Sequence, residues 1–477
     1  MPARRPHILV IMTDQQRADA LRCAGHPVLR TPHLDRLAAR GVRFANAFTV
    51  APLCMPARAS LLSGLYPHNH GLWSNQATPA NELPAGDETV FRLLRDAGYA
   101  TGHIGKGHYY AWNLVRHLKE REEYVRALGF DYVHETTGPH FARTIRSSLT
   151  DHWEALGLYQ RFRAGYAPPQ GTPRRPWDII PSPLPVEEHL DSYVGRVATE
   201  FVERYTGHRP FALFVGFGGP HEPWDAPGEY ATMYDPAQVP PPIPAAEPGP
   251  WVPPAAAARM RAGRVEGMAE AHVRQLRANY YGKISLIDYW VGQILGAVEQ
   301  RGWRDETLVV FTSDHGEMAG DHGRLHKTVF YESSIRIPLL VSWPGQTAAG
   351  AVAAGLVESI DLVPTLLEAA GAAPARRSLG RSLWPALRDP AATLRDDVLS
   401  EVQAGYGAPD HARNTLMLRT ERYKYAVDGN GDGFLLHDLA ADPQEQTNLI
   451  GHPDCGALEA VLRDRLFRRL VRCQPVR

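Results

Sequence analysis

Short apolar runs alternate with helical patterns through the first three-quarters of the chain. "HILVIM" (7–12) is a continuous apolar run, as expected of a strand buried on both faces. "HLDRLAARGVRFANAF" and "DETVFRLLRDAGYATGHIGKGH" each predict a helix, a turn at glycine and a further strand. "PFALFVGFGGPH" and "TLVVFTSDHGE" are predicted strands that end in polar residues, whose side chains can bind ligands or act in catalysis. This alternation predicts an α/β fold in which helices flank a large sheet.

A long helix is predicted between the last two of these strands. Its apolar positions recur at spacings of three and four residues, which is the stripe of a helix packed on a sheet. A helix followed by a strand places the residues after the strand at the carboxyl edge of the sheet, where open α/β folds bind ligands. The stripe consists of Ile284, Ile287, Val291, Ile294 and Val298.

Two segments interrupt the alternation, and the character of the chain changes near residue 372. Residues 109–190 are helical and aromatic-rich, which predicts an insertion over the sheet edge. Residues 220–254 contain twelve prolines, too many for regular structure, so we expect an extended loop. After residue 371, an antiparallel strand pair and a closing helix are predicted. We therefore expect a catalytic domain at 1–371 and a smaller C-terminal α+β subdomain at 372–477.

Composition narrows the classes of partner. Of the 477 residues, 44% are apolar and 22% charged, and the formal net charge is -1. These values are typical of a soluble globular protein. A net charge so close to zero does not attract nucleic acid or anionic lipid to the molecule as a whole. The N-terminal apolar run is too short for a signal sequence, and no stretch of eighteen apolar residues occurs. Four scattered cysteines do not make a disulfide framework. The cytoplasm is the expected compartment, and the oligomeric state stays open.

Polar residues at two strand ends suggest a metal site. Asp14 and Gln15 follow the first strand, and Asp314 and His315 follow the strand "TLVVFTS". Carboxylate and amide oxygens with one imidazole suit Ca²⁺, Mg²⁺ or Mn²⁺. Either pair alone would more often be a helix cap or a turn. Their joint appearance favours a single divalent metal.

Cationic residues gather at the same predicted edge. Taken singly, each would be a surface or structural residue, but together they indicate a pocket for a tetrahedral oxyanion. These residues are Arg58, Lys106, His108, His221 and Lys327.

The stretch "CMPARASLLSG", which begins at Cys54, carries the family resemblance. It resembles the type I sulfatase signature C-x-P-x-R followed by a small residue and glycine, in which the cysteine is oxidised to formylglycine. Five further blocks resemble sulfatases in the usual order: "ILVIMTDQQRAD", "GYATGHIGKGH", "GGPHEPWDAP", "TLVVFTSDHGEMAGDHG" and "LLHDLAADPQEQTNL". "IDLVPTLLEAAG" (360–371) does so as well. The resemblance covers almost the whole chain and implies an alkaline-phosphatase-like fold.

The resemblance also implies a mechanism. A formylglycine-generating enzyme would recognise Cys54 by Pro56 and Arg58, which follow it in the sequence. The aldehyde hydrates to a geminal diol, and one hydroxyl attacks the sulfur of a sulfate monoester. The second hydroxyl, deprotonated by His108, then expels sulfate and restores the aldehyde. By the same resemblance Ca²⁺ is the first choice of metal, held by Asp14, Gln15, Asp314, His315 and the oxygen derived from Cys54.

The substrate-binding residues are implied in the same way. Lys106, His221 and Lys327 would bind sulfate oxygens, and either His221 or Lys327 would protonate the leaving alcohol. Asn75 reaches the pocket in one interpretation and caps a turn in the other. The substrate is expected to be a small-molecule or sugar sulfate ester. Four tryptophans either stack on it or pack within loops: Trp112, Trp153, Trp177 and Trp224.

Departures from the family pattern leave a second function open. Gln15 and His315 stand where many sulfatases have Asp and Asn, so this chain looks closer to choline sulfatases and phosphonate monoester hydrolases. The latter lack the Lys-x-His that Lys106 and His108 supply, so sulfate esters come first and phosphonate or phosphate diesters second. A non-catalytic homologue and a two-metal phosphatase or mutase are weaker alternatives. "DGNGDGFLLHDL" (428–439) begins like an EF-hand loop but has leucine at position twelve, which favours a hairpin turn.

Overall fold

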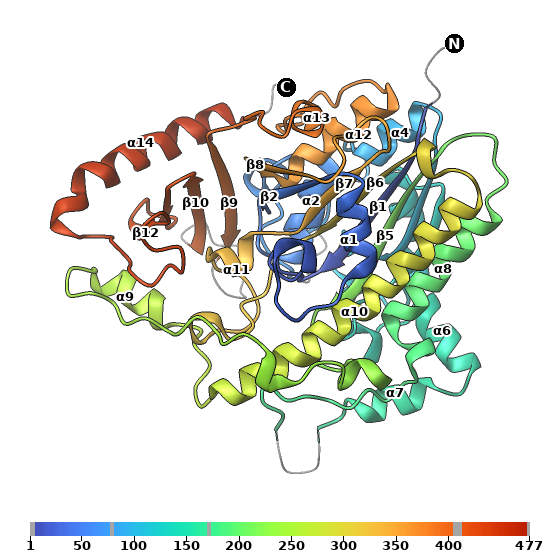
Figure 1. The fold of residues 1–477 in the computed structure, drawn as a ribbon, viewed down its shortest axis with the longest axis horizontal. Coiled ribbons are helices and arrows are strands. Elements are labelled where there is room, and N and C mark those ends of the chain that lie inside the picture. The colour runs from blue at the N-terminus through green and yellow to red at the C-terminus, as the bar shows by residue number, and fades with distance from the viewer. Residues whose placement is uncertain (1–4, 77–80, 169–172, 404–412, 475–477) are drawn as a thin grey trace.

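One large mixed sheet organises the computed structural model, which describes residues 5–76, 81–168, 173–403 and 413–474 (Figure 1). Its strand order is β4-β3-β5-β1-β6-β7-β2-β8. β7 pairs antiparallel with both of its neighbours, and all other pairs in the sheet's described part are parallel. The strands are β1 (His7–Asp14), β2 (Val42–Phe48), β3 (Ala100–Lys106), β4 (Tyr132–Thr136), β5 (Phe211–Pro220), β6 (Thr307–Ser313), β7 (Leu339–Ser342) and β8 (Ala351–Glu358).

Helices cover both faces of this sheet (Figure 1). The α-helices are α1 (Pro32–Ala39), α2 (Cys54–Ser63), α3 (Pro67–His70), α4 (Val90–Asp96), α5 (Glu122–Ala127), α6 (Ser148–Ala155), α7 (Tyr159–Gly165), α8 (Leu190–Arg204), α9 (Pro254–Arg261), α10 (Glu270–Gln300), α11 (Glu332–Ile335), α12 (Leu362–Ala370), α13 (Trp384–Arg388) and α14 (Gly456–Arg472).

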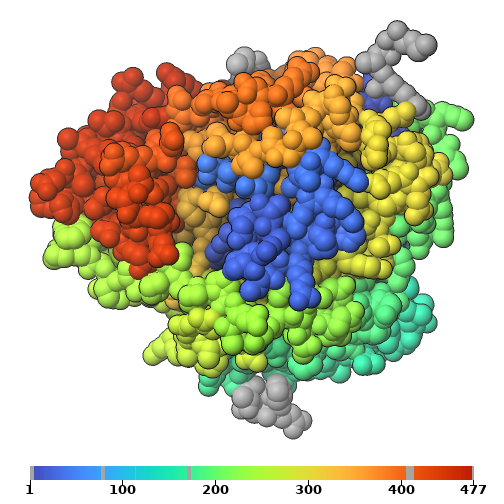
Figure 2. Space-filling model, viewed as in Figure 1, coloured from blue at the N-terminus to red at the C-terminus, as the bar shows by residue number. Residues whose placement is uncertain are grey.

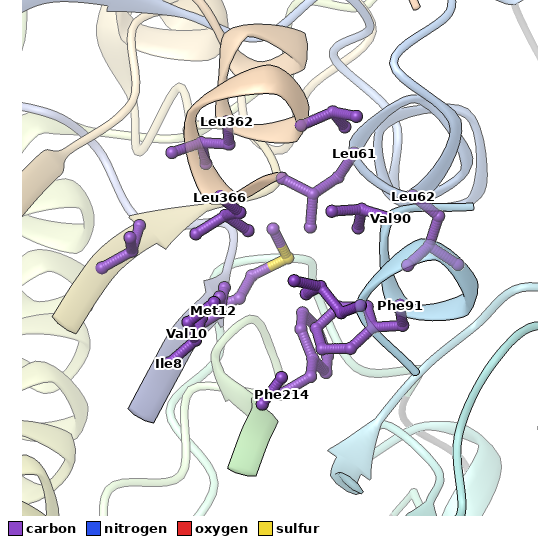
Figure 3. Packing of buried hydrophobic residues seen from close by; sticks show 14 of the residues in the cluster. Ile8, Val10, Met12, Leu61, Leu62, Val90, Phe91, Phe214, Leu362 and Leu366 are labelled. Carbon is purple, nitrogen blue, oxygen red and sulfur yellow. The ribbon is translucent and has the colours of Figure 1, made fainter. Parts of the chain in front are cut away.

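The side chains of β1 alternate between two hydrophobic cores. Ile8, Val10 and Met12 point into a cluster formed with α2, α4 and α12, as Figure 3 shows. Leu9 and Ile11 point to the opposite face, where α1, α8 and α10 pack. A strand has a side-chain period of two, so a continuous apolar run is what a strand buried on both faces requires. The predicted stripe of residues 284–298 is confirmed as the buried face of α10.

The topology gathers four strand ends at one edge. β3, β5, β1 and β6 are neighbours and run parallel, so their carboxyl ends lie side by side. The residues at or just after these ends are Lys106, His221, Asp14 and Asp314. This arrangement confirms the α/β fold class expected from the sequence and sets the position of the candidate site.

The C-terminal part forms a second, antiparallel sheet of order β12-β11-β10-β9, with α14 packed on it. Its strands are β9 (Asp397–Gln403), β10 (Asn414–Thr420), β11 (Tyr423–Val427) and β12 (Gly433–Asp438). Figure 2 shows this part, in red, as a lobe directly against the rest of the molecule. The expected strand pair is thus part of four strands. Residues 428–432 make the predicted hairpin turn, in which Asp428 N donates to Asp432 O.

The two interrupting segments behave differently. Between the end of β5 at Pro220 and the start of α9 at Pro254, the regular structure is two short 3₁₀ turns and an isolated bridge from Trp224 to Ile179, as the prolines predict. The segment 109–190 was expected to be helical, but it also supplies β4, the edge strand that pairs with β3. The sequence "YVHET" is too short and too polar to reveal a strand by its own pattern, and its pairing with a neighbour determines it. None of the helices in the described ranges has the length and hydropathy needed to cross a bilayer.

Candidate active site

Two strand ends and the start of α2 bring four of the five predicted metal-site residues together. Asp14 closes β1, and Asp314 and His315 follow β6. The site holds one possible ligand atom from each of four buried residues: Asp14, Cys54, Asp314 and His315. These four atoms all lie within 4.8 Å of one another. His315 Nδ1 donates to Gly316 O at 3.0 Å, which leaves Nε2 facing the centre. Two carboxylates, with an imidazole whose other ring nitrogen is held by a backbone carbonyl, fit a divalent cation.

The sequence around Cys54 explains its position in the site. Leu53 is extended and Cys54 is the first residue of α2, a helix whose ten residues are all buried and which Gly64 ends in a left-handed conformation. Cys54 Sγ lies 3.2 Å from His315 Nε2 and 3.9 Å from Asp14 Oδ1. Burial and Asp14 act to raise the pKa of this thiol, but the cations of Lys327 and Lys106 outweigh them and lower it.

Arg58 lies one turn further along α2 and connects three strand ends. It is fully buried. Its guanidinium donates to Asp314 Oδ2 at 2.9 Å, to Asp14 Oδ2 at 3.1 Å and to Lys106 O at 2.7 Å. Burial opposes the charge, but Asp314 and Asp14 raise the pKa of Arg58 above its ordinary value. The arginine of the C-x-P-x-R pattern therefore fixes the carboxylates that face Cys54.

Two lysines and a histidine complete the cationic side of the site. Lys106 Nζ lies 2.5 Å from Asp14 Oδ2, and Lys327 Nζ lies 2.8 Å from His221 Nε2. His221 Nδ1 donates to Glu222 O at 2.7 Å, so Nε2 is the nitrogen that faces Lys327. Burial, together with Lys327, holds the pKa of His221 well below its ordinary value.

His108 is held in a conformation that packing enforces. Its φ of 56° lies in the left-handed region, which is costly for a residue with a side chain. Its ring stacks on Trp112 at 4.2 Å between centroids, and its buried Nδ1 has no hydrogen-bond partner among the described residues. Burial and the neighbouring Lys106 and Arg58 hold its pKa well below the ordinary value. The imidazole is therefore neutral and able to accept a proton.

Two carboxylates that sequence reasoning missed orient Gln15. Gln15 Nε2 donates to Glu222 Oε2 at 2.7 Å and also to Glu317. Its other amide atom, Oε1, accepts a hydrogen bond from Lys327. Carboxylates only accept, so they fix which way the amide points and direct its oxygen toward the cationic side. Both glutamates stand in blocks quoted above, "GGPHEPWDAP" and "TLVVFTSDHGEMAGDHG", but only the fold shows their common partner.

Replacing Glu317 with glutamine tests this orientation. The new amide group would compete with Gln15 Nε2 and allow the Gln15 side chain to turn. Loss of such a supporting contact typically weakens metal binding about 10–100-fold. We expect Glu317→Gln to show that loss in a titration with Ca²⁺, whereas Glu299→Gln, a change in an exposed glutamate of α10, should leave the affinity as it is. Equal affinities for all three proteins would contradict the assignment.

The remaining predicted residues lie further from the strand ends. Asn75 Oδ1 accepts the backbone N–H of Met55 at 2.9 Å, so it supports the start of α2 beside Cys54. A substrate-binding role for Asn75 stays a prediction. The four tryptophans singled out in the sequence are buried, which agrees with loop packing: Trp112, Trp153, Trp177 and Trp224.

Comparisons with known proteins agree with this geometry. The model of the family described as "Sulfatase" matches residues 6–372, and that described as "N-sulphoglucosamine sulphohydrolase, C-terminal" matches 320–472. The multifunctional alkaline phosphatase superfamily protein PehA of Trinickia caryophylli is 31% identical over 96% of this chain and 93% of its own. The ulvan-active sulfatase of Formosa agariphila is 30% identical over 98% of this chain and 81% of its own. The phosphonate monoester hydrolase of Agrobacterium radiobacter has a TM-score of 0.81 at 25% identity, covering 98% of this chain and 96% of that one.

Proposed function

The chain belongs to the sulfatase family and hydrolyses sulfate esters, and we propose that residue 54, as formylglycine, is its nucleophile beside one divalent metal ion. The observation that carries the proposal is the position of Cys54. It begins a wholly buried helix and faces two carboxylates and an imidazole, while lysines lower the pKa of its thiol. As formylglycine, this residue supplies a geminal diol, in which one hydroxyl attacks and the other permits release of sulfate.

Asp14, Gln15, Asp314 and His315 would hold the metal. Their oxygens are hard ligands, which supports Ca²⁺ as the first choice, and the imidazole keeps Mg²⁺ and Mn²⁺ open. A divalent ion there supplies Lewis-acid polarisation of the reacting oxygens. Asp314 and the Cys54 thiol, against the effect of burial, raise the pKa of His315 to about 9. Metal binding at this site should therefore release a proton from His315.

The lysines and histidines of the pocket share the remaining tasks in the proposal. Lys106, His221 and Lys327 bind the three non-bridging oxygens of sulfate and stabilise the charge that develops on them. His108, neutral and partly unpartnered, takes the proton whose loss expels sulfate. The leaving alcohol receives its proton through His221: Nε2 takes a proton from the Lys327 ammonium, 2.8 Å away, and passes it to the alcohol oxygen, while Nδ1 keeps its own proton on Glu222 O.

Maturation requires a second protein in this proposal. A formylglycine-generating enzyme would act on Cys54 before folding, because the finished structure buries the residue. All four cysteines are free, which supports a reducing compartment such as the cytoplasm. We further propose the division into a catalytic domain at 1–371 and a C-terminal subdomain at 372–477, since the second sheet and α14 pack together in one cluster, to which Val50, Tyr66 and Ile360 of the first part also contribute.

The likeness to phosphonate monoester hydrolases favours one second candidate, a phosphonate monoester or phosphodiester hydrolase. The two candidates predict opposite substrate preferences. We expect 4-nitrophenyl sulfate to have a higher kcat/KM than phenyl 4-nitrophenyl phosphate. Lys106, Lys327 and His221 can together meet the three free oxygens of a sulfate monoester, whereas a diester forces an organic group against one of them. Steady-state kinetics on the metal-loaded enzyme measures this, and faster turnover of the diester would favour the second candidate.

A further inference from the structure

A cavity adjoins the catalytic residues. Its volume is about 270 Å³, and it lies where the insertion meets the segments that follow β4 and β5. This volume is just below the usual range for small-molecule pockets, so it suits one ring or a short chain. Its lining includes Pro139, His140, Arg143, Tyr166, Arg174 and Arg175 on one side, with Glu222, Trp224 and His326 on the other.

Three contacts join this cavity to the groups assigned to catalysis. The Glu222 side chain lines the cavity and approaches His221 Nδ1 to 3.2 Å. The ring of His140 lies edge-on to that of His221, with 5.6 Å between centroids. Gly138 lies next to Pro139 in the cavity wall. It is so close to Lys106 that a Cβ added at Gly138 would lie 3.2 Å from Lys106 Nζ. If His221 protonates the leaving alcohol, as the proposed function holds, the cavity is the place for the alcohol part of the substrate.

The cavity is lined by arginines whose charge is not neutralised. None of Arg143, Arg174 and Arg175 forms an ion pair with a carboxylate in the described parts of the chain. Arg174 Nη2 donates to the carbonyl oxygens of Gly165 and Ala167, both at 3.0 Å, while its buried Nε has no partner among those residues. Arg143 Nε donates to His140 O at 3.3 Å. The guanidinium groups of Arg143 and Arg174 are thus held by carbonyl oxygens, yet they keep donors and charge for a ligand.

The acidic residues of the lining are occupied elsewhere. Asp178 accepts the backbone N–H of Arg175 at 2.8 Å. Glu222 accepts from Gln15 Nε2 and also lies 3.2 Å from His326 Nδ1. Neither carboxylate is an ion-pair partner of the arginines, so the cavity presents a positive face to whatever enters. This charge disfavours a quaternary ammonium alcohol.

We propose that the alcohol part of the substrate carries a second oxyanion, a carboxylate or a further sulfate, which Arg143 and Arg174 bind. The planar guanidinium fork matches both groups, and a hydrogen bond between charged partners is about twice as strong as a neutral one. This inference rests on the proposed function, because it assumes that the ester bond lies beside His221. It makes the enzyme selective for acidic sulfate esters.

A matched set of aryl sulfates tests the proposal. The sulfate ester of 3-hydroxybenzoate carries a carboxylate, its carboxamide analogue is neutral, and resorcinol bis-sulfate carries a second sulfate. For the wild-type enzyme we expect the kcat/KM of at least one anionic ester to exceed that of the carboxamide about 10–100-fold, as one charge-assisted contact provides. Which anionic ester is preferred identifies the oxyanion. Equal values for all three, or preference for the carboxamide, would overturn the proposal.

Variants locate the preference in the cavity. Arg143→Gln and Arg174→Gln should each reduce the ratio of anionic to neutral ester toward one, mainly through KM. Arg163→Gln, a change in an exposed arginine of α7 outside the cavity, should keep the wild-type ratio. Melting temperatures confirm that the variants fold. A ratio that survives both changes would overturn the assignment of these arginines. Inactivity of the wild-type enzyme on 4-nitrophenyl sulfate as well would instead contradict the proposed function.

Discussion

Replacing Cys54 with alanine is expected to lower kcat/KM for 4-nitrophenyl sulfate by at least about 10⁴-fold, the usual cost of removing a covalent nucleophile. The residue contributes little bulk to the core, so the fold should survive. Cys455→Ala, which removes another free cysteine far along the chain, is the matched control and should keep wild-type activity. Melting temperatures separate a loss of chemistry from a loss of folding.

The serine variant distinguishes the diol mechanism from a simple nucleophile. A serine hydroxyl can accept the sulfuryl group but has no second hydroxyl with which to release it. Cys54→Ser should therefore lack turnover and accumulate a sulfated peptide that mass spectrometry detects. An alanine or serine variant that turned over within about tenfold of the wild type would show that residue 54 is not the nucleophile.

The second large effect concerns proton donation by His221. Nitrophenolate leaves without help, whereas an alkoxide needs a proton. His221→Ala should therefore lower kcat/KM about 10²–10⁴-fold more for an alkyl sulfate than for 4-nitrophenyl sulfate, the usual size of general-acid catalysis. A residue that only holds sulfate oxygens would cost both substrates the same factor. The ratio of the two losses is the measurement.

Two further variants make this comparison decisive. Lys327→Ala removes the ammonium that lies 2.8 Å from His221 Nε2, and His208→Ala changes an exposed histidine far from the site. If His221 loses the same factor with both esters while Lys327 shows the leaving-group dependence, the acid is Lys327. The His208 variant should match the wild type with both substrates.

Much of the site can be predicted from the sequence, because neighbouring parallel strands place their carboxyl ends at the same edge of the sheet. Apolar runs identify β1, β5 and β6, and the glycine turn after a predicted helix identifies β3. A polar residue just after any of these strands must lie at the carboxyl edge. Asp14, Lys106, His221 and Asp314 are all of this kind, and the structure brings them together with Cys54. Their chemical roles stay predictions.

Other features depend on contacts that no local pattern encodes. β4 is a strand because it pairs with β3 at the edge of the sheet. Its five residues show no clear alternation of apolar and polar side chains. Glu317 matters through the Gln15 amide, a partner about 300 positions away in the sequence. The arginine-lined cavity combines loops that lack any periodicity, and it forms only when the insertion folds back over the sheet edge.

The most direct test is the mass of the tryptic peptide 44–58, which contains Cys54, measured together with activity. The protein should be prepared with and without a co-expressed formylglycine-generating enzyme. We predict that specific activity rises in proportion to the fraction of this peptide whose cysteine has become the aldehyde. A fully active preparation in which the peptide carries only the thiol would contradict the proposed mechanism.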